Sequence, residues 1–421
     1  MELLVLCPHY APDVAPTGEV MTQIATSLVE RGHRLHIVTA LPWYRHHAVE
    51  EGWTGRPWRT ETTEWGRITR VHPFPTDKRN IPARALAFGG FTALSAALAA
   101  LTPRRPDAVL AMSPPLTLGL AGRAVATLRR APFVFNIQDV FPDVAVEVGV
   151  LTNPKVIAAA RRLERVSYQA ADAVTVLSDD LRANLVEKLA GRRRGSARKV
   201  RVIPNFVDTE RIRPADPTSP NAYRTEFGLD GKQVVLYAGN IGYSQSLDLV
   251  VEAARRLRDR DDVVFVVNGG GSGRIDLEAS AAGLDNIRFV DMQPKERLPE
   301  VLAAGDIHLV PLRRGLAKAS VPSKLYSILA AGRPVVASVD EGTEVATTVD
   351  RAGAGLAVPP EDPDAFTAAL VELLDDPARA RAMGASGRRF VEGWASPAAV
   401  AERYEALFDE LRAFSRWRAP N

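Results

Sequence analysis

Residues 320–338 read SVPSKLYSILAAGRPVVAS, and this stretch decides the fold. Its first half predicts a short helix, because Ser and Pro are favoured at a helix start. Gly332 follows the last helical residue, and Pro334 prevents the helix from continuing. Residues 335–337 then form an apolar run that is typical of a buried parallel strand. Lys324 lies in the first turn, where the helix dipole disfavours a cation unless an anion binds there. It marks either an anion site or a plain surface lysine.

The alternation of strand and helix continues outward from this stretch through the whole chain. Apolar runs typical of parallel strands occupy residues 2–6, 35–39, 107–113, 133–137, 173–178, 200–205, 234–239, 263–267, 287–290 and 307–312. An aromatic-rich excursion that carries short strands interrupts them at residues 41–80. The pattern predicts an α/β protein of two doubly wound domains, residues 1–205 and 223–396. A proline-rich linker at residues 206–222 joins them, and a long helix follows from Pro397.

The composition is that of an ordinary globular protein. The chain has 421 residues, of which 46% are hydrophobic and 24% charged, and its net charge of +3 gives no argument for nucleic acid as a partner. The single Cys7 excludes an internal disulfide framework and a cysteine metal cluster, which fits a cytoplasmic protein. We expect no signal peptide, because no basic segment precedes the first apolar run.

Two segments predict contact with a membrane surface. Residues 83–101 are almost uncharged and long enough to span a bilayer, but Gly89 and Gly90 favour a buried or docked helix over a spanning one. The basic run from Arg192 to Lys199 is either a solvated loop or a patch for anionic lipid. Together they predict a peripheral contact at the inner face of a membrane, near a polyprenyl-linked acceptor.

Loops rich in small residues follow three predicted strands of the second half, at residues 239–242, 269–273 and 313–323. Glycine lets backbone N–H groups approach phosphate oxygens closely, so these loops predict a phosphate-containing ligand. A nicotinamide dehydrogenase is disfavoured, because only Gly18 lies near the first helix start and the dinucleotide fingerprint is missing. In the first half, Gln138 and Asp139 follow a strand where ligands of open α/β sheets bind.

Motifs with specific spacing occur along the whole chain. They are YAP (10–12), RGH (31–33), QDVFP (138–142), PNFVD (204–208), YAGNIG (237–242), GxG (269–271), VPSKLY (321–326), AGRPV (331–335) and PEDP (360–363). Together they resemble the GT-B glycosyltransferases of the retaining family GT4, and within it the colanic-acid and O-antigen transferases. The resemblance implies two Rossmann-like domains that face each other across a cleft, with the terminal helix, residues 397–421, crossing back to the first domain.

The resemblance also implies an activity. We expect transfer of a sugar from a nucleotide-diphosphate sugar, UDP- favoured over GDP-, to a hydroxyl acceptor in glycan, polysaccharide or glycoconjugate biosynthesis. The anomeric configuration would be retained, the second domain would bind the donor and the first the acceptor. No metal and no other cofactor is expected, and the acceptor is either polyprenyl-linked or a small molecule.

The chain departs from the family pattern at the donor site. Ala319 and Ser327 stand where most members carry an E-x7-E pair, and Asn240 and Gln245 stand where most carry Arg and Lys. We therefore expect Lys324 to supply the cation that stabilises the diphosphate leaving group. The expected donor-binding residues are Gly18, Gly239, Asn240, Gly242, Gln245, Gly269, Gly271, Arg274, Ser323, Lys324, Ser327 and Glu344.

On the acceptor side, we expect Asp139 to hold or deprotonate a hydroxyl, with Gln138 beside it. The alternative is that Asp139 only caps the next turn, and His9 is expected to be structural. Two other functions stay open. One is a sugar-nucleotide 2-epimerase of GT-B fold, which the lack of suitable histidines in the second half disfavours. The other is a catalytically silent nucleotide-binding scaffold, which the missing E-x7-E pair would suit.

Overall fold

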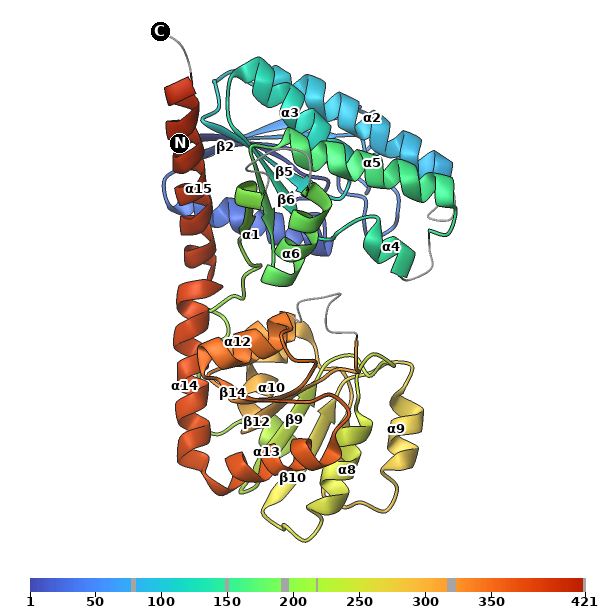
Figure 1. The fold of residues 1–421 in the computed structure, drawn as a ribbon, viewed down its shortest axis with the longest axis vertical. Helices are drawn as coiled ribbons and strands as arrows, with labels where there is room; N and C mark the ends of the chain where they lie inside the picture. The colour runs from blue at the N-terminus through green and yellow to red at the C-terminus, as the bar shows by residue number, and fades with distance from the viewer. Residues whose placement is uncertain (77–80, 148–150, 191–196, 217–218, 316–322, 419–421) are drawn as a thin grey trace. The chain divides into compact units, whose positions relative to one another are not determined.

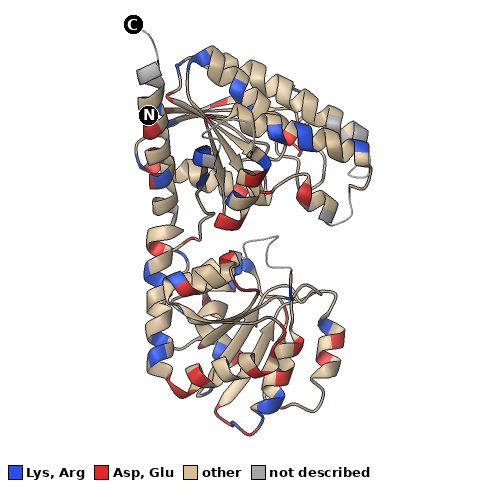
Figure 2. Ribbon diagram, in the orientation of Figure 1, with Lys and Arg blue, Asp and Glu red and all other residues tan. Residues whose placement is uncertain are grey.

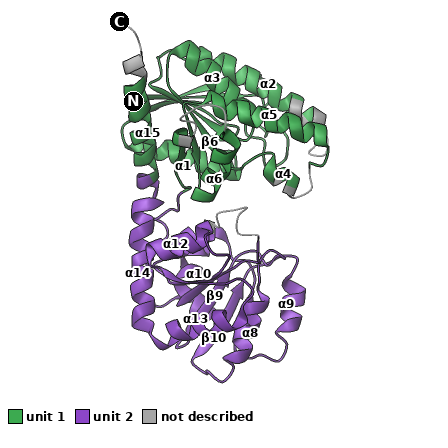
Figure 3. Cartoon of the chain, viewed as in Figure 1, with its two compact units in different colours: residues 1–205, 400–421 green, residues 206–399 purple. Residues whose placement is uncertain are grey.

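The computed structural model describes residues 1–421 except 77–80, 148–150, 191–196, 217–218, 316–322 and 419–421 (Figure 1). The chain forms two units, residues 1–205 with 400–421, and residues 206–399 (Figure 3). Both are α/β units built on largely parallel sheets, which confirms the predicted fold class. Residues 206–222, expected as a linker, belong to the second unit.

The first unit is built on an eight-stranded sheet of order β3-β4-β2-β1-β5-β6-β7-β8. All neighbours are parallel except β3 and β4, which pair in antiparallel fashion within the aromatic-rich excursion. The central strands are buried throughout because helices cover the sheet, and this explains their unbroken apolar runs. The strands are β1 (Glu2–Leu6), β2 (Arg34–Ala40), β3 (Trp58–Thr63), β4 (Gly66–Val71), β5 (Ala108–Ser113), β6 (Phe133–Ile137), β7 (Ala173–Val176) and β8 (Val200–Val202).

Helices of the first unit begin where the sequence supplies caps. The Asn153 side chain accepts a hydrogen bond from the backbone N–H of Lys155, and Ser178 accepts one from Leu181. The helices are α1 (Pro16–Glu30), α2 (Ile81–Ala100), α3 (Thr117–Arg129), α4 (Asp143–Glu147), α5 (Pro154–Ala170), α6 (Asp179–Leu189), the 3-10 turn Ala197–Lys199 and most of α15 (Pro397–Arg418). Within the described ranges, no helix has both the length and the apolar character of a membrane span.

Polar contacts hold the C-terminal helix α15 in the first unit, and one of them is buried. The Tyr404 hydroxyl accepts a hydrogen bond of 2.9 Å from Asn136 of β6. Glu405 pairs with Arg31 and with His33, whose Nε2 lies 2.5 Å from a Glu405 oxygen. His33 therefore has a structural role, and the RGH motif serves to hold α15.

The second unit has a parallel six-stranded sheet of order β11-β10-β9-β12-β13-β14. Its strands are β9 (Gln233–Ala238), β10 (Val263–Asn268), β11 (Ile287–Val290), β12 (Ile307–Pro311), β13 (Val335–Ser338) and β14 (Gly355–Val358). Its helices are α7 (Ala222–Glu226), α8 (Asp248–Arg256), α9 (Arg274–Ser280), the 3-10 turn Lys295–Arg297, α10 (Leu298–Ala304), α11 (Ser323–Ala330), α12 (Glu344–Ala352), α13 (Pro363–Asp375) and α14 (Pro377–Trp394).

The stretch that decides the fold forms α11 and β13, as predicted. Gly332 adopts φ +68°, the left-handed conformation that ends α11. Helix α14 was not expected, because Gly384 and Gly387 interrupt its helical pattern. A Cβ on Gly384 would lie 2.1 Å from the carbonyl oxygen of Gly332. The glycines of α14 thus allow it to pack directly on the end of α11.

Candidate active site

Lys324 lies at the centre of the candidate donor site in the second unit. From the first turn of α11, its Nζ donates a hydrogen bond of 3.1 Å to the Tyr237 hydroxyl and lies 4.3 Å from the Tyr237 ring centroid. Among the residues that the structure describes, it forms no ion pair. Partial burial removes water from the ammonium group and lowers the pKa of Lys324 to about 8.

The pH dependence of the reaction should reflect the protonation of Lys324. Lys324 is cationic below its pKa, and a diphosphate binds the cationic form, so donor capture is complete at low pH and lost as the pH rises through about 8. We expect kcat/KM at limiting donor to fall about tenfold between pH 7 and pH 9. Lys324→Arg should remove this fall, because arginine stays charged. A profile that is flat across this range in the unmodified protein would contradict the assignment.

Two glycine-rich loops lie against each other beside Lys324. Gly269, after β10, is so close to the β9 loop that a Cβ would lie 1.8 Å from the Gly239 carbonyl oxygen. The Ile241 N–H donates to the Gly270 carbonyl over 2.8 Å, and the Gly273 N–H donates to Ile241 over 3.0 Å. The predicted donor residues of both loops are thereby gathered at the carboxyl ends of β9 and β10, namely Gly239, Asn240, Gly242, Gln245, Gly269 and Gly271.

Side chains fix the shape of the β9 loop. The Tyr237 hydroxyl donates a hydrogen bond of 2.5 Å to the Asn240 carbonyl, and Gln245 Oε1 accepts one of 3.1 Å from the Gly242 N–H. Gly271 has φ +151°, and a Cβ there would meet the Ile241 carbonyl oxygen at 2.3 Å. Gln245 thus holds the loop through its side chain and Asn240 through its backbone carbonyl, at positions where most GT4 members would place cations.

A cavity of about 410 Å³ opens beside these loops. Three predicted donor-site residues line it: Gly239, Lys324 and Ser327. Other lining residues come from the segment after β11 and from α10, which the sequence analysis did not assign to the site: Met292, Gln293, Pro294, Lys295 and Leu298. These residues follow a parallel strand, where ligands of open α/β sheets bind, and this position could have predicted that they line the site. A smaller cavity of about 110 Å³ includes Gly242 and Gln245.

Two predicted donor residues use their side chains in contacts within the second unit. Arg274 begins α9, and its guanidinium donates to the Gly269 carbonyl, to Glu278 and to Asp291, so its charge is engaged within the protein. Glu344 begins α12, is buried, and accepts a hydrogen bond of 3.2 Å from Thr348. Ser323 is the first residue of α11, while the expected departure at Ala319 lies outside the described residues.

The first unit has an aromatic cavity of about 370 Å³, which contains the predicted acceptor residue Asp139. Residues from the segments after β1, β2 and β4 and from α2 line it, among them His9, Trp43, Tyr44, His47, Phe74, Phe88 and Phe91. Partial burial raises the pKa of Asp139, although the residue keeps contact with solvent. The sequence alone does not connect the aromatic-rich excursion with Asp139, because the two are far apart along the chain.

A His–Asp pair borders the same cavity. His9 Nδ1 lies 2.6 Å from Asp13 Oδ2, and the buried Asp13 also accepts a hydrogen bond of 3.1 Å from the Tyr44 N–H. The His9 ring stacks on Trp43 with the ring centroids 5.7 Å apart. Gly18, a predicted phosphate contact, packs on this pair, since a Cβ there would lie 2.8 Å from the His9 Cβ. His9 is thus a cavity residue that we had expected to be only structural.

Gln138 does not belong with these side chains. It is buried, its Nε2 donates to Asn136 over 2.8 Å, and its Oε1 accepts from Asn205 over 2.9 Å. Asn136 in turn holds Tyr404 of α15. The Gln138 amide is therefore committed to a structural network, and we retain only Asp139 as an acceptor contact.

Comparisons with known proteins identify similar glycosyltransferases. A family profile described as "Glycosyl transferase 4-like domain" matches residues 17–205, and one described as "Glycosyl transferases group 1" matches residues 232–376. The putative colanic acid biosynthesis glycosyl transferase WcaI of Escherichia coli K12 is 31% identical over 382 residues, which cover 89% of this chain and 92% of that protein.

Solved structures share the fold along the whole chain. Sucrose-phosphate synthase from Thermosynechococcus elongatus has a TM-score of 0.69 at 19% identity, covering 98% of this chain and all of that one (100%). HepE of Anabaena, solved in complex with UDP, has a TM-score of 0.65 at 14% identity with the same coverage. On its sequence relatives and its fold, the chain belongs to the GT4 family of GT-B glycosyltransferases.

Proposed function

We propose that the protein transfers a sugar from a nucleoside-diphosphate sugar, UDP- favoured over GDP-, to a hydroxyl of a glycan or glycolipid acceptor. The reaction retains the anomeric configuration and uses no metal ion. The second unit binds the donor through Lys324, and the first unit binds the acceptor through the cavity that contains Asp139. The observation that carries this proposal is the partly buried ammonium of Lys324, which no described carboxylate neutralises.

A diphosphate is the ligand that suits Lys324 best. Removing an ammonium group from water costs free energy unless an anion or several acceptors replace the water. The Tyr237 hydroxyl and ring offset part of that cost, and bound phosphate oxygens would offset the rest. Negative charge grows on the leaving diphosphate as the glycosidic bond breaks, so the same cation stabilises the transition state.

The nucleoside fits the cavity lined by the segment after β11. Met292, Pro294 and Leu298 offer apolar surface for a planar base, while Gly239 and Lys324 lie at the same cavity on the phosphate side. We favour UDP because the HepE structure that shares this fold holds UDP.

The acceptor side combines aromatic surface with a carboxylate. Aromatic side chains stack on the apolar faces of sugar rings or on a lipid chain, and Trp43, Tyr44 and Phe91 supply such surface in the first unit. Asp139 can accept a hydrogen bond from the attacking hydroxyl, and a pKa raised by burial makes its carboxylate a better proton acceptor.

Asp139→Asn should separate acceptor from donor function. We expect kcat/KM for the acceptor to fall roughly 100-fold, because the amide no longer accepts a proton. UDP affinity should stay unchanged, since the donor contacts lie in the second unit. Initial rates at varied acceptor, with UDP titrated by calorimetry, measure both quantities. The exposed Asp230→Asn is the matched control. Unchanged acceptor kinetics in Asp139→Asn would remove Asp139 from the site.

Incubation of the protein with UDP- and GDP-sugars and a lipid-linked acceptor tests the function as a whole. We expect transfer from a UDP-sugar, with the product's anomeric configuration matching that of the donor in ¹H NMR. Epimerisation of the donor without transfer would instead identify a sugar-nucleotide epimerase. Nucleotide binding without turnover of any donor would identify a silent scaffold.

We further propose that the acceptor is linked to a polyprenyl lipid and that the reaction takes place at the cytoplasmic face of a membrane. The aromatic and apolar lining of the Asp139 cavity supports a lipid-linked acceptor. The basic run at residues 192–199 had been expected to contribute to membrane contact, but residues 191–196 lie outside the described part of the chain.

A further inference from the structure

We propose that the outer face of helices α2, α3 and α5 binds the surface of an anionic phospholipid bilayer. These helices form one layer on the sheet of the first unit (Figure 1), with α3 in contact with both of the others. We call their outward side chains the three-helix face, and its members are Leu86, Ala93, Ala97, Leu101, Leu120, Ala124, Leu128, Lys155, Val156, Arg161, Arg162, Arg165 and Val166. The proposal rests on the proposed function only in its account of the acceptor.

Half of this face is apolar. Leu86, in the second turn of α2, and Leu101, directly after the last residue of α2, are 78% and 76% exposed, and Leu128 of α3 is 67% exposed. Between the two leucines, α2 exposes Gly89, Ala93 and Ala97. No polar side chain therefore interrupts the apolar stripe on the outward side of α2 between them. Scattered exposed leucines are normal in globular proteins, but a continuous apolar stripe on neighbouring helices is typical of a contact surface.

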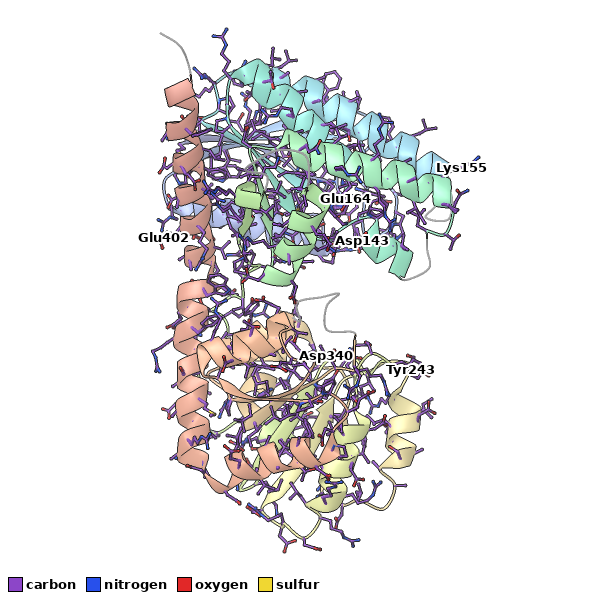
Figure 4. The ribbon with its side chains drawn as sticks, viewed as in Figure 1. Asp143, Lys155, Glu164, Tyr243, Asp340 and Glu402 are labelled. Atoms are coloured by element: carbon purple, nitrogen blue, oxygen red, sulfur yellow. The ribbon has the colours of Figure 1, made fainter. Side chains whose placement is uncertain are left out.

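The other half of this face is basic. Lys155, Arg161, Arg162 and Arg165 are exposed along α5, whose positively charged residues are blue in Figure 2. None of the four pairs with an acid among the described residues. Arg161, Arg162 and Arg165 line a groove on α5 with Val166. Lys155 projects outward at the end of α5 in Figure 4.

The three helices contain a single acidic residue, Glu164. It is buried, and Lys188 Nζ lies 2.5 Å from its carboxylate and 2.7 Å from the carboxylate of Asp143. Figure 4 shows Glu164 on the side of α5 that faces Asp143. Arg161 and Arg165 also border a groove that Asp143, Glu164 and Glu187 line. None of the outward members of the three-helix face is acidic, however, and this suits an anionic surface.

A bilayer suits this face better than a second copy of the chain. A two-fold dimer through α5 would place Arg161, Arg162 and Arg165 against their own copies, and like charges repel. In a bilayer, leucines insert among acyl chains while arginines bind phosphate groups at the surface.

Helix α2 also connects this face with the acceptor cavity. Ala87, Phe88 and Phe91 of α2 line the cavity that contains Asp139, while Leu86 and Ala93 of the same helix point outward. An acceptor anchored by a lipid chain in the bilayer would therefore reach the cavity along α2.

Vesicle flotation of the full-length protein, without donor or acceptor, tests the proposal. We expect binding to vesicles of phosphatidylcholine with phosphatidylglycerol, weakening at high salt, and little binding to phosphatidylcholine alone. The variant R161Q/R162Q/R165Q should bind roughly 100-fold more weakly, since each basic residue near an anionic surface contributes several-fold. The matched control R258Q/R381Q/R389Q removes the same charge from exposed positions of the second unit and should bind normally.

A second variant, L86Q/L128Q, tests the apolar half and should also lose binding while melting at an unchanged temperature, because both side chains are exposed. The proposal is overturned if the protein does not float with anionic vesicles, or if the triple arginine variant floats as well as the control. It is also overturned if the protein is a dimer that L86Q/L128Q separates. Transfer to a water-soluble acceptor should be unchanged in these variants, so a failure of the proposed function is seen separately.

Discussion

Lys324→Ala should lower kcat/KM for the donor roughly 100-fold, the size of effect that loss of one transition-state contact produces. The lysine ammonium is held by the Tyr237 hydroxyl at 3.1 Å and by the Tyr237 ring, and it has no acid partner among the described residues. Loss of the side chain removes the positive charge at the point where the leaving diphosphate gains negative charge. Steady-state rates at varied donor concentration measure the effect.

Two further variants separate charge from packing at this position. Lys324→Met keeps most of the side-chain volume without its charge, so it should be as slow as Lys324→Ala. Lys232→Ala removes an exposed lysine at the opposite end of β9 and should leave the rate unchanged. If Lys324→Ala reacts at a near-normal rate and its melting temperature is unchanged, the lysine has no part in catalysis.

Gly269→Ala should disable the donor site by steric conflict. A Cβ on residue 269 would lie 1.8 Å from the Gly239 carbonyl oxygen, a backbone atom that cannot move without displacing the β9 loop. We expect the free energy of unfolding to fall by about 3 kcal/mol and UDP affinity to fall at least tenfold. Urea unfolding and calorimetry measure the two quantities.

The neighbouring Gly270→Ala is the matched control. No heavy atom lies within 4 Å of the Cβ position at Gly270, and its φ is compatible with alanine. We expect this variant to keep both its stability and its UDP affinity. Equal behaviour of Gly269→Ala and Gly270→Ala would show that the close approach of the two loops does not determine the donor site.

The fold was largely predictable from the sequence, because local rules determine most of its elements. Val335 and its neighbours are apolar without interruption, as expected of a strand covered on both faces, and Gly332 ends α11 in the conformation that favours glycine. Helix α14 was not predicted, because its glycines are required by tertiary packing and not by local helix propensity. Gly384 and Gly387 weaken the local helical signal, yet they are needed there because another part of the chain packs against them.

The candidate site was predictable only in part. Lys324 stood out because a cation at a helix start is locally unfavourable. Its contact with Tyr237 spans 87 residues of sequence, and no local rule gives such a pairing. His9 was assigned a structural role for the same reason, since its position beside Asp139 arises only when loops after separate strands meet. Gln138 was predicted to contact the acceptor because it is a polar residue at a strand end. Its amide is instead hydrogen-bonded to Asn136 and Asn205.

We propose above all that Lys324 binds the diphosphate of the donor. Calorimetric titration of UDP and UMP into the unmodified protein and into Lys324→Met, at pH 7, tests it most directly. UMP lacks the second phosphate, so we expect the unmodified protein to bind UDP at least tenfold more tightly than UMP, a difference of about 1.4 kcal/mol. This preference should be lost in Lys324→Met. An undiminished preference for UDP in that variant would contradict the claim.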